Sequence, residues 1–205
     1  QGSWPLPDGV LAQALEILAQ HRPRAIGLDI YRDVPVSPGS DRLWLLLQRD
    51  RRIIGVNKYG DERSRGIPSH PVLRGTDRTG FNDILVDPGG TVRRGLLFLD
   101  DGSSVEYAFA LRLALLYLQT EGVIPRPDPA NPRHLKLGRT TIRPLEPDEG
   151  AYVGADARGY QFLLDLRRAS APFPSVTLAE LFSGAVEPAA IRDKIVVIGR
   201  TAECV

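Results

Sequence analysis

Two short apolar runs, each ending in polar residues, lie near the two ends of this sequence. The first is Arg24–Asp33 (RAIGLDIYRD) and the second is Asp193–Ala202 (DKIVVIGRTA). Runs this apolar that follow helical patterns are typical of strands buried on both faces of a parallel sheet. Because ligands of open α/β sheets bind at the carboxyl ends of such strands, the polar residues that end each run mark a candidate binding crevice.

The residues between these runs predict an α/β fold. We expect a mainly parallel central sheet flanked by helices, with an inserted hairpin and long loops. A helix over residues 8–20, with Asp8 as its N-cap, precedes the first strand. A second helix, capped by Ser40 or Asp41, leads to a strand at Arg52–Val56, and this β-α-β order favours a right-handed parallel pair.

Turn residues and capping patterns in the sequence predict the helices and strands that follow. Pro88-Gly89-Gly90 predicts a hairpin within Gly80–Leu99. Two capping-box patterns, Ser103 with Glu106 and Thr177 with Glu180, predict a long buried helix to Glu121 and a short helix. The remaining predicted elements are a surface hairpin at Leu135–Ile142, a strand within Tyr160–Leu166 and a final strand at Lys194–Gly199. Gly199 is expected to allow a close backbone approach, so that valine there destabilises the fold.

Length and composition narrow the class of protein. The 205 residues fit one domain spanning 1–205. A formal net charge of +1 gives no electrostatic reason to expect a nucleic-acid partner. The lone Cys204 excludes an internal disulfide and a thiol metal cluster. No stretch approaches the roughly 18 apolar residues of a membrane span, and the absence of Met predicts an excised or processed piece.

Motifs for metal, cofactor or nucleophilic chemistry are missing from the sequence. His21, His70 and His134 are scattered, without the short spacing of zinc ligands. The sequence has no G-x-S-x-G elbow and no Walker A motif, and no G-x-G-x-x-G follows the first strand. We therefore predict neither a metal site nor a cofactor.

Charged residues near the strand ends are the remaining candidates. Asp29 and Asp33 flank the exit of the first strand, and paired carboxylates can serve acid–base chemistry or bind a cation. A structural role is the favoured interpretation for these carboxylates. Arg93 and Arg94 follow the hairpin turn, and strand alternation puts them on opposite faces. A buried arginine needs a partner, so we expect the inward one to form a structural ion pair with a carboxylate such as Asp29 or Asp83, with an anion site as the less favoured alternative.

Several stretches together resemble the second type of CHASE domain (cyclases/histidine kinases associated sensory extracellular domain). They run in order over nearly the whole sequence: Trp4-Pro5 with Pro7, Pro23–Asp33, Gly80–Asp83, Asp87–Arg94, Phe109–Ala114, Gly159–Gln161, Phe173–Leu178, Ile191–Gly199 and Thr201-Ala202. The Asp-Ile-Tyr-Arg and Gly-Tyr-Gln versions resemble those of bacterial members, cyanobacterial ones included.

The resemblance implies an extracytoplasmic sensory domain held in the cell membrane by flanking spans. It implies a cytoplasmic output that is an adenylate or guanylate cyclase, a histidine kinase, a serine/threonine kinase or a diguanylate cyclase. The family brings no established ligand, and therefore no ligand residues.

We therefore expect a sensor of a small-molecule or protein ligand that acts by population shift and is not an enzyme. The candidate ligand-binding residues are Asp29, Tyr31, Arg32, Asn57, Asp83, Arg93 and Thr201. One alternative is a module that forms a homodimer or binds a partner protein without a small-molecule ligand, a role that suits the long loop Tyr59–Thr79. The least favoured alternative is a hydrolase or transferase that uses Asp29 and Asp33.

Overall fold

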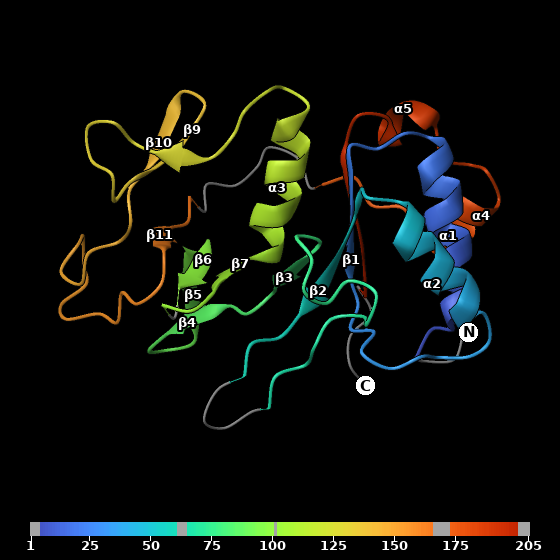
Figure 1. Cartoon of the computed structure of the whole chain (residues 1–205), viewed down its shortest axis with the longest axis horizontal. Coiled ribbons are helices and arrows are strands. Elements are labelled where there is room, and N and C mark those ends of the chain that lie inside the picture. The colour runs from blue at the N-terminus through green and yellow to red at the C-terminus, as the bar shows by residue number, and fades with distance from the viewer. Residues whose placement is uncertain (1–4, 61–64, 101, 166–172, 201–205) are drawn as a thin grey trace.

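Four parallel strands form the central sheet of the structure, a computed structural model that describes residues 5–60, 65–100, 102–165 and 173–200. Their spatial order is β12 (Ile195–Gly199), β1 (Ala25–Asp29), β2 (Ile53–Asn57) and β3 (Thr79–Phe81). Figure 1 shows this sheet beside a group of smaller antiparallel sheets. The α/β fold with a parallel central sheet is thus confirmed.

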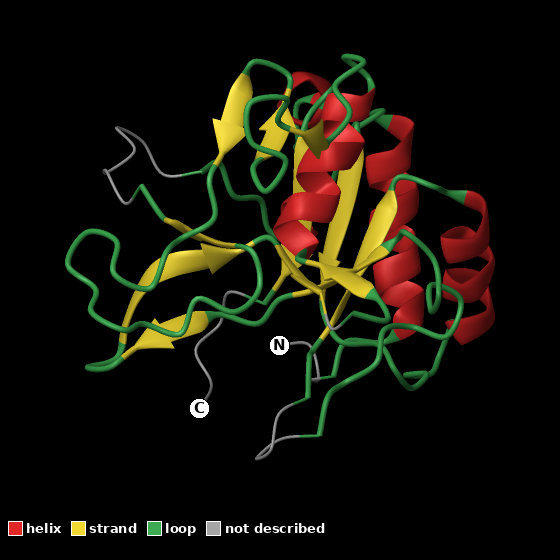
Figure 2. Cartoon of the chain, turned by 60° about the vertical axis from the view of Figure 1, so that its left-hand side comes forward, coloured by secondary structure: helices red, strands yellow, loops and turns green. Residues whose placement is uncertain are grey.

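Helices cover both faces of the central sheet (Figures 1 and 2). One face carries α1 (Asp8–Gln20) and α2 (Ser40–Arg49), and the short helices α4 (Leu178–Phe182) and α5 (Pro188–Ile191) extend the same core. The opposite face carries α3 (Phe109–Gln119). Within the described residues, no helix is both long and apolar enough to cross a bilayer.

Alternation along β1 explains why its residues are buried on two sides. Ile26 and Leu28 join the core under α1 and α2, whereas Ala25 packs toward α3. Gly27 also faces α3, where a Cβ atom would lie only 2.6 Å from Cζ of Phe109. The missing side chain of Gly27 therefore lets α3 sit close to the sheet.

The last strand differs from the prediction of burial on both faces. β12 is an edge strand that pairs with β1 alone among the described strands. Its residues alternate in burial, and Ile195 and Val197 remain 39% and 54% exposed. The close approach expected at Gly199 is also wrong, because a Cβ there would lie 3.7 Å from Cβ of Asp29, an ordinary contact.

The predicted first hairpin is formed by β4 (Leu85–Asp87) and β5 (Thr91–Leu96), and β11 (Gln161–Leu163) pairs with β5 to complete a small antiparallel sheet. Gly80, which we assigned to the hairpin, instead lies in β3 of the parallel sheet.

The capping box predicted at Ser103 does not open a helix. Val105–Tyr107 is a strand, β7, which pairs with β6 (Phe98–Asp100), and α3 starts only at Phe109. Strand pairing over Val105–Tyr107 outweighs the local capping signal. The helix is apolar on two sides because Leu113 packs toward the central sheet and Leu111 toward the smaller sheets.

A third small sheet lies beyond α3. It contains β8 (Arg126–Pro127), β9 (Leu135–Leu137) and β10 (Thr140–Ile142), and the last two form the predicted surface hairpin with Gly138 at φ +56°. The second predicted capping box is confirmed, since Thr177 and Glu180 cap α4 reciprocally.

Candidate functional site

Polar side chains gather at the carboxyl ends of the parallel strands. Asp29 ends β1, Asn57 ends β2, and Asn82 and Asp83 follow β3 directly. Parallel strands bring their carboxyl ends to one edge of the sheet, which is why residues far apart in the sequence meet here. We call Asp29, Tyr31, Asn57, Asn82 and Asp83 the strand-exit cluster.

Asn82 connects this cluster through two hydrogen bonds. The Tyr31 hydroxyl donates to Oδ1 of Asn82 at 2.7 Å, and Nδ2 of Asn82 donates to Oδ1 of Asp29 at 2.8 Å. Burial raises the pKa of the Tyr31 phenol, and the nearby carboxylates of Asp83 and Asp29 raise it further. Tyr31 therefore stays protonated at neutral pH and donates its hydrogen bond. Our candidate residues did not include Asn82, although it lies between Phe81 and Asp83 in a stretch of the family pattern.

The other two members of the cluster, Asn57 and Asp83, lie at the carboxyl ends of β2 and β3. The backbone N–H of Tyr59 donates to Oδ2 of Asp83 at 2.8 Å, which ties the start of the long loop to the sheet. Oδ1 of Asn57 is buried and has no hydrogen-bond partner among the described residues. Four predicted residues, Asp29, Tyr31, Asn57 and Asp83, are thus brought together, while their role as ligand contacts remains a prediction.

Arg32 lies at the same edge, but its guanidinium group is engaged with the start of α1. It is 4% exposed, with Nε 3.2 Å from Oδ1 of Asp8 and with a hydrogen bond from Nη2 to the carbonyl of Leu6. The Nε–Oδ1 contact is an ion pair without hydrogen-bond alignment. Burial lowers the pKa of Arg32, and the charge of Asp8 opposes that shift.

Asp8 is not the N-cap that the sequence predicted. Pro7 holds the cap position, and Asp8 is the first helical residue, 1% exposed. Its Oδ2 accepts hydrogen bonds from the Val36 backbone at 2.9 Å and from the Ser40 hydroxyl at 2.8 Å. The buried carboxylate therefore joins the starts of α1 and α2 to Arg32 beyond β1.

Arg93 lies far from the strand-exit cluster, on β5 of the antiparallel sheet. The expected arginine pairing with Asp29 or Asp83 is wrong, because Arg93 and Arg94 both contact Asp87. Asp87 also accepts a hydrogen bond from the Tyr152 hydroxyl at 2.7 Å, and this bond and the arginines lower its pKa. Arg94 is the inward one, as expected, and Arg93 is half exposed. Thr201, the last candidate, lies outside the described residues.

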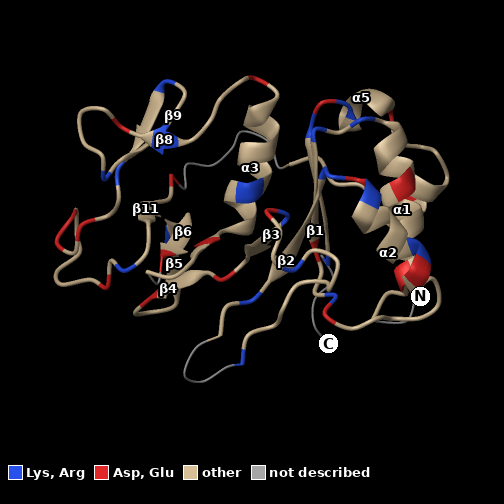
Figure 3. Ribbon diagram, viewed as in Figure 1, with Lys and Arg blue, Asp and Glu red and all other residues tan. Residues whose placement is uncertain are grey.

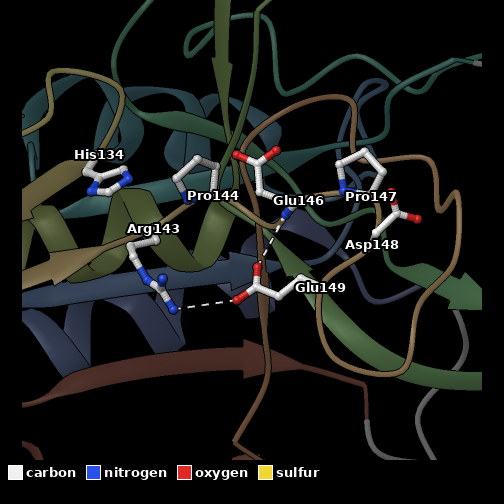
Figure 4. Close-up of a pocket in the computed structure, with 7 residues that line it drawn as sticks. All are labelled: His134, Arg143, Pro144, Glu146, Pro147, Asp148 and Glu149. Atoms are coloured by element: carbon white, nitrogen blue, oxygen red, sulfur yellow. Dashed lines mark hydrogen bonds and ion pairs between the residues drawn. The ribbon is translucent and has the colours of Figure 1, made fainter.

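Two surface hollows lie among the smaller sheets, and both are lined by His134 and Pro144. One, of about 420 Å³, we call the charged hollow (Figure 4). Its polar lining includes Arg143 and Glu149, 3.5 Å apart, and Figure 4 shows the Glu149 carboxylate pointing toward Arg143. The other, of about 510 Å³, lies against α3 and is lined mainly by apolar and aromatic side chains.

The structure thus combines an α/β domain, a polar cluster at the strand ends and two hollows that lie away from that cluster. The family model described as CHASE2 domain matches residues 1–205, the whole sequence, and the chain belongs to the CHASE2 family. CHASE2 domains are extracellular sensor domains of signalling receptors and are not themselves catalytic. No curated protein and no solved structure matches the chain.

Proposed function

We propose that this chain is the ligand-sensing, extracytoplasmic part of a bacterial membrane receptor with flanking membrane helices. Its cytoplasmic output is a cyclase, a histidine kinase, a serine/threonine kinase or a diguanylate cyclase. Membership of the CHASE2 family supports the sensory role. The choice of output rests on the family resemblance alone.

The observation that carries this proposal is the meeting of the two described chain ends at one edge of the sheet. The N-terminal end lies there because the Leu6 carbonyl accepts a hydrogen bond from Arg32, three residues after β1. The C-terminal end lies there because Gly199 is in register with Asp29. Two membrane helices can therefore carry the domain from one edge.

Signalling at this edge follows from a shift between two arrangements of the domain. A ligand that binds one arrangement more tightly raises its population, and only differential affinity can do so. The buried Asp8–Arg32 pair joins the start of α1 to the strand exit, so a change in β1 reaches both chain ends. We expect α1 and the segment after Gly199 to pass this change to the membrane helices.

Membrane topology tests the receptor proposal. In the full-length parent, with Cys204 replaced by serine, Val153→Cys introduces a thiol at a position that is 92% exposed. A membrane-impermeant maleimide should label this cysteine in intact spheroplasts. Leu11→Cys, at a position that is 0% exposed, is the matched control and should react only after denaturation. Labelling of Val153→Cys only after the membrane is permeabilised contradicts an extracytoplasmic location.

A second candidate function is association between copies of the domain through β12. The observation that favours it is the exposed apolar pair Ile195 and Val197 on an edge strand, because such edges and patches pair with other chains. Sedimentation should show a dimer that Val197→Lys disrupts and Val153→Lys, in an exposed loop, does not. A monomer over the whole concentration range contradicts this candidate.

A further inference from the structure

We propose that the hollow between α3 and the β8–β9–β10 sheet binds a small anion with a flat apolar body, such as an aromatic carboxylate. We call it the aromatic hollow. Its volume of about 510 Å³ falls within the range of small-molecule sites. The residues that line it and enter the argument are Phe98, Tyr107, Leu111, Leu115 and Tyr160 on its apolar side, and Arg126, Arg133 and His134 at its polar rim.

The apolar side of the hollow is lined by three aromatic rings that pack on one another. The ring centroid of Phe98 lies 4.6 Å from that of Tyr160 and 5.9 Å from that of Tyr107. Leu111 and Leu115 of α3 complete this side. A flat apolar ligand matches this lining, because aromatic rings pack favourably against other rings in offset or tilted arrangements.

The polar rim carries positive charge without an acidic partner. Arg126 and Arg133 line the hollow together with His134, and no Asp or Glu lines it. No ion pair or side-chain hydrogen bond joins either guanidinium to another described residue. Figure 3 shows basic residues at β8. By contrast, Arg143 in the charged hollow is paired with Glu149 (Figure 4). The rim therefore selects a carboxylate, which arginine binds with two parallel hydrogen bonds.

The walls of the hollow are held in place before any ligand binds. The Tyr160 hydroxyl accepts a hydrogen bond from the Leu135 N–H at 2.6 Å and donates one to the Ile142 carbonyl at 2.7 Å. Asp128 accepts hydrogen bonds from the Thr141 hydroxyl at 2.5 Å and from the Ala130 N–H at 2.8 Å. Binding to a preorganised wall costs little ordering entropy.

A ligand bound in this hollow would affect the packing of the central sheet through α3. Leu111 and Leu115 face the ligand, while Phe109 and Leu113 of the same helix pack against the sheet. Only this signalling consequence rests on the proposed receptor function. The binding site itself is argued from the residues of the hollow.

Calorimetric titration of the purified 205-residue chain tests the binding site with three probes. Naphthoate combines the apolar rings with a carboxylate, naphthylmethylamine has the same rings with a positive charge, and acetate has the charge without the rings. We expect saturable binding of naphthoate and much weaker binding of the other two. No binding of naphthoate, or equal binding of the amine, overturns the proposal.

Rim variants locate the binding site. Arg126→Gln and Arg133→Gln should each weaken naphthoate binding at least about threefold, because each removes a charged hydrogen-bond donor. Arg139→Gln, in the β9–β10 turn outside both hollows, is the matched control and should leave affinity unchanged. Equal affinities for all three variants overturn the assignment of the site. The calorimetric titration does not depend on which side of the membrane the domain lies. A negative titration therefore overturns only the binding site, and a negative maleimide experiment overturns only the proposed receptor function.

Discussion

Among single residues, Asp8 should be the carboxylate whose removal destabilises the fold most. Asp8→Ala leaves Arg32 buried without its charge partner and removes two hydrogen bonds, so the free energy of unfolding should fall by about 3–5 kcal/mol. Asp41→Ala, an exposed site in the first turn of α2, should change it by less than about 0.5 kcal/mol. Urea unfolding of both variants provides the measurement, and equal midpoints would contradict the role given to Asp8.

Two glycines on neighbouring strands form a matched pair for a second test. At Gly27 a Cβ meets Phe109 at 2.6 Å and Leu113 at 2.8 Å, whereas at Gly199 the nearest atom is 3.7 Å away. Gly27→Ala should therefore cost about 1–3 kcal/mol of stability, the usual range for overpacking a core. Gly199→Ala should have little effect. Thermal unfolding compares the two, and a larger loss at Gly199 would show that β12 is misplaced.

Sequence reasoning located most of the strand-exit residues because it needed only strand direction. The carboxyl ends of β1 and β2 follow from apolar runs, and the residues after them share an edge. Asn82 was missed because it follows β3, which is only three residues long, and the sequence pattern there predicts a hairpin instead. The engagement of Arg32 with Asp8 was missed because it depends on how α1 packs beside the sheet.

At the scale of elements, Asp128 makes the β8–β9–β10 sheet sensitive to acid. The hydrogen bond from Thr141, together with that from the Ala130 N–H and the charge of Lys136, lowers the pKa of Asp128 from 3.8 to about 2. Because the folded pKa is the lower one, ionised Asp128 stabilises the sheet above about pH 4, and this contribution is lost as the pH falls toward 2.

Nuclear magnetic resonance can measure this pH dependence at the Ala130 amide. We expect its resonance to shift in the acid range where Asp128 takes up a proton. Asp128→Asn should abolish the shift, whereas Asp148→Asn, in the charged hollow, should retain it. An Ala130 amide that does not respond to acid in the unsubstituted chain would contradict the hydrogen bond.

A capping-box pattern in the sequence predicted the start of a helix correctly only where the same residues do not pair in a strand. Thr177 and Glu180 cap α4 as expected, whereas Ser103 and Glu106 do not cap α3. The difference is that β7 pairs with β6 across Asp100–Val105, a tertiary preference invisible to the capping pattern. The position of β12 also depends on tertiary pairing. Its apolar sequence is typical of a central strand, but β12 lies at the edge of the sheet.

At the scale of the whole molecule, α3 separates the proposed ligand site from the strand exits. Its Leu111 side faces the aromatic hollow, and its Phe109 side packs against the sheet whose carboxyl edge holds both described ends of the chain. Sequence reasoning placed the ligand at the strand exits by analogy with other α/β sheets. Both hollows lie elsewhere. The aromatic hollow forms between α3 and strands whose β6–β7 and β8–β9 pairings the sequence did not predict.

The proposed full-length receptor provides a matched test at the edge where both described ends of the chain lie. Arg32 and Arg42 each pair with a carboxylate of α1, but Arg32 meets Asp8 at this edge and Arg42 meets Glu16 on the exposed helical surface. Lysine keeps the charge and loses the planar guanidinium contacts at both positions. Each variant must first be shown to be folded, by the melting temperature of the purified domain.

The most direct measurement is then the enzymatic output of the full-length receptor in membranes, compared between Arg32→Lys and Arg42→Lys at equal expression. The account predicts that Arg32→Lys changes the output, because it alters the link between β1 and α1, and that Arg42→Lys leaves it unchanged. An unaltered output in a folded Arg32→Lys receptor would contradict the claim that this edge transmits the signal.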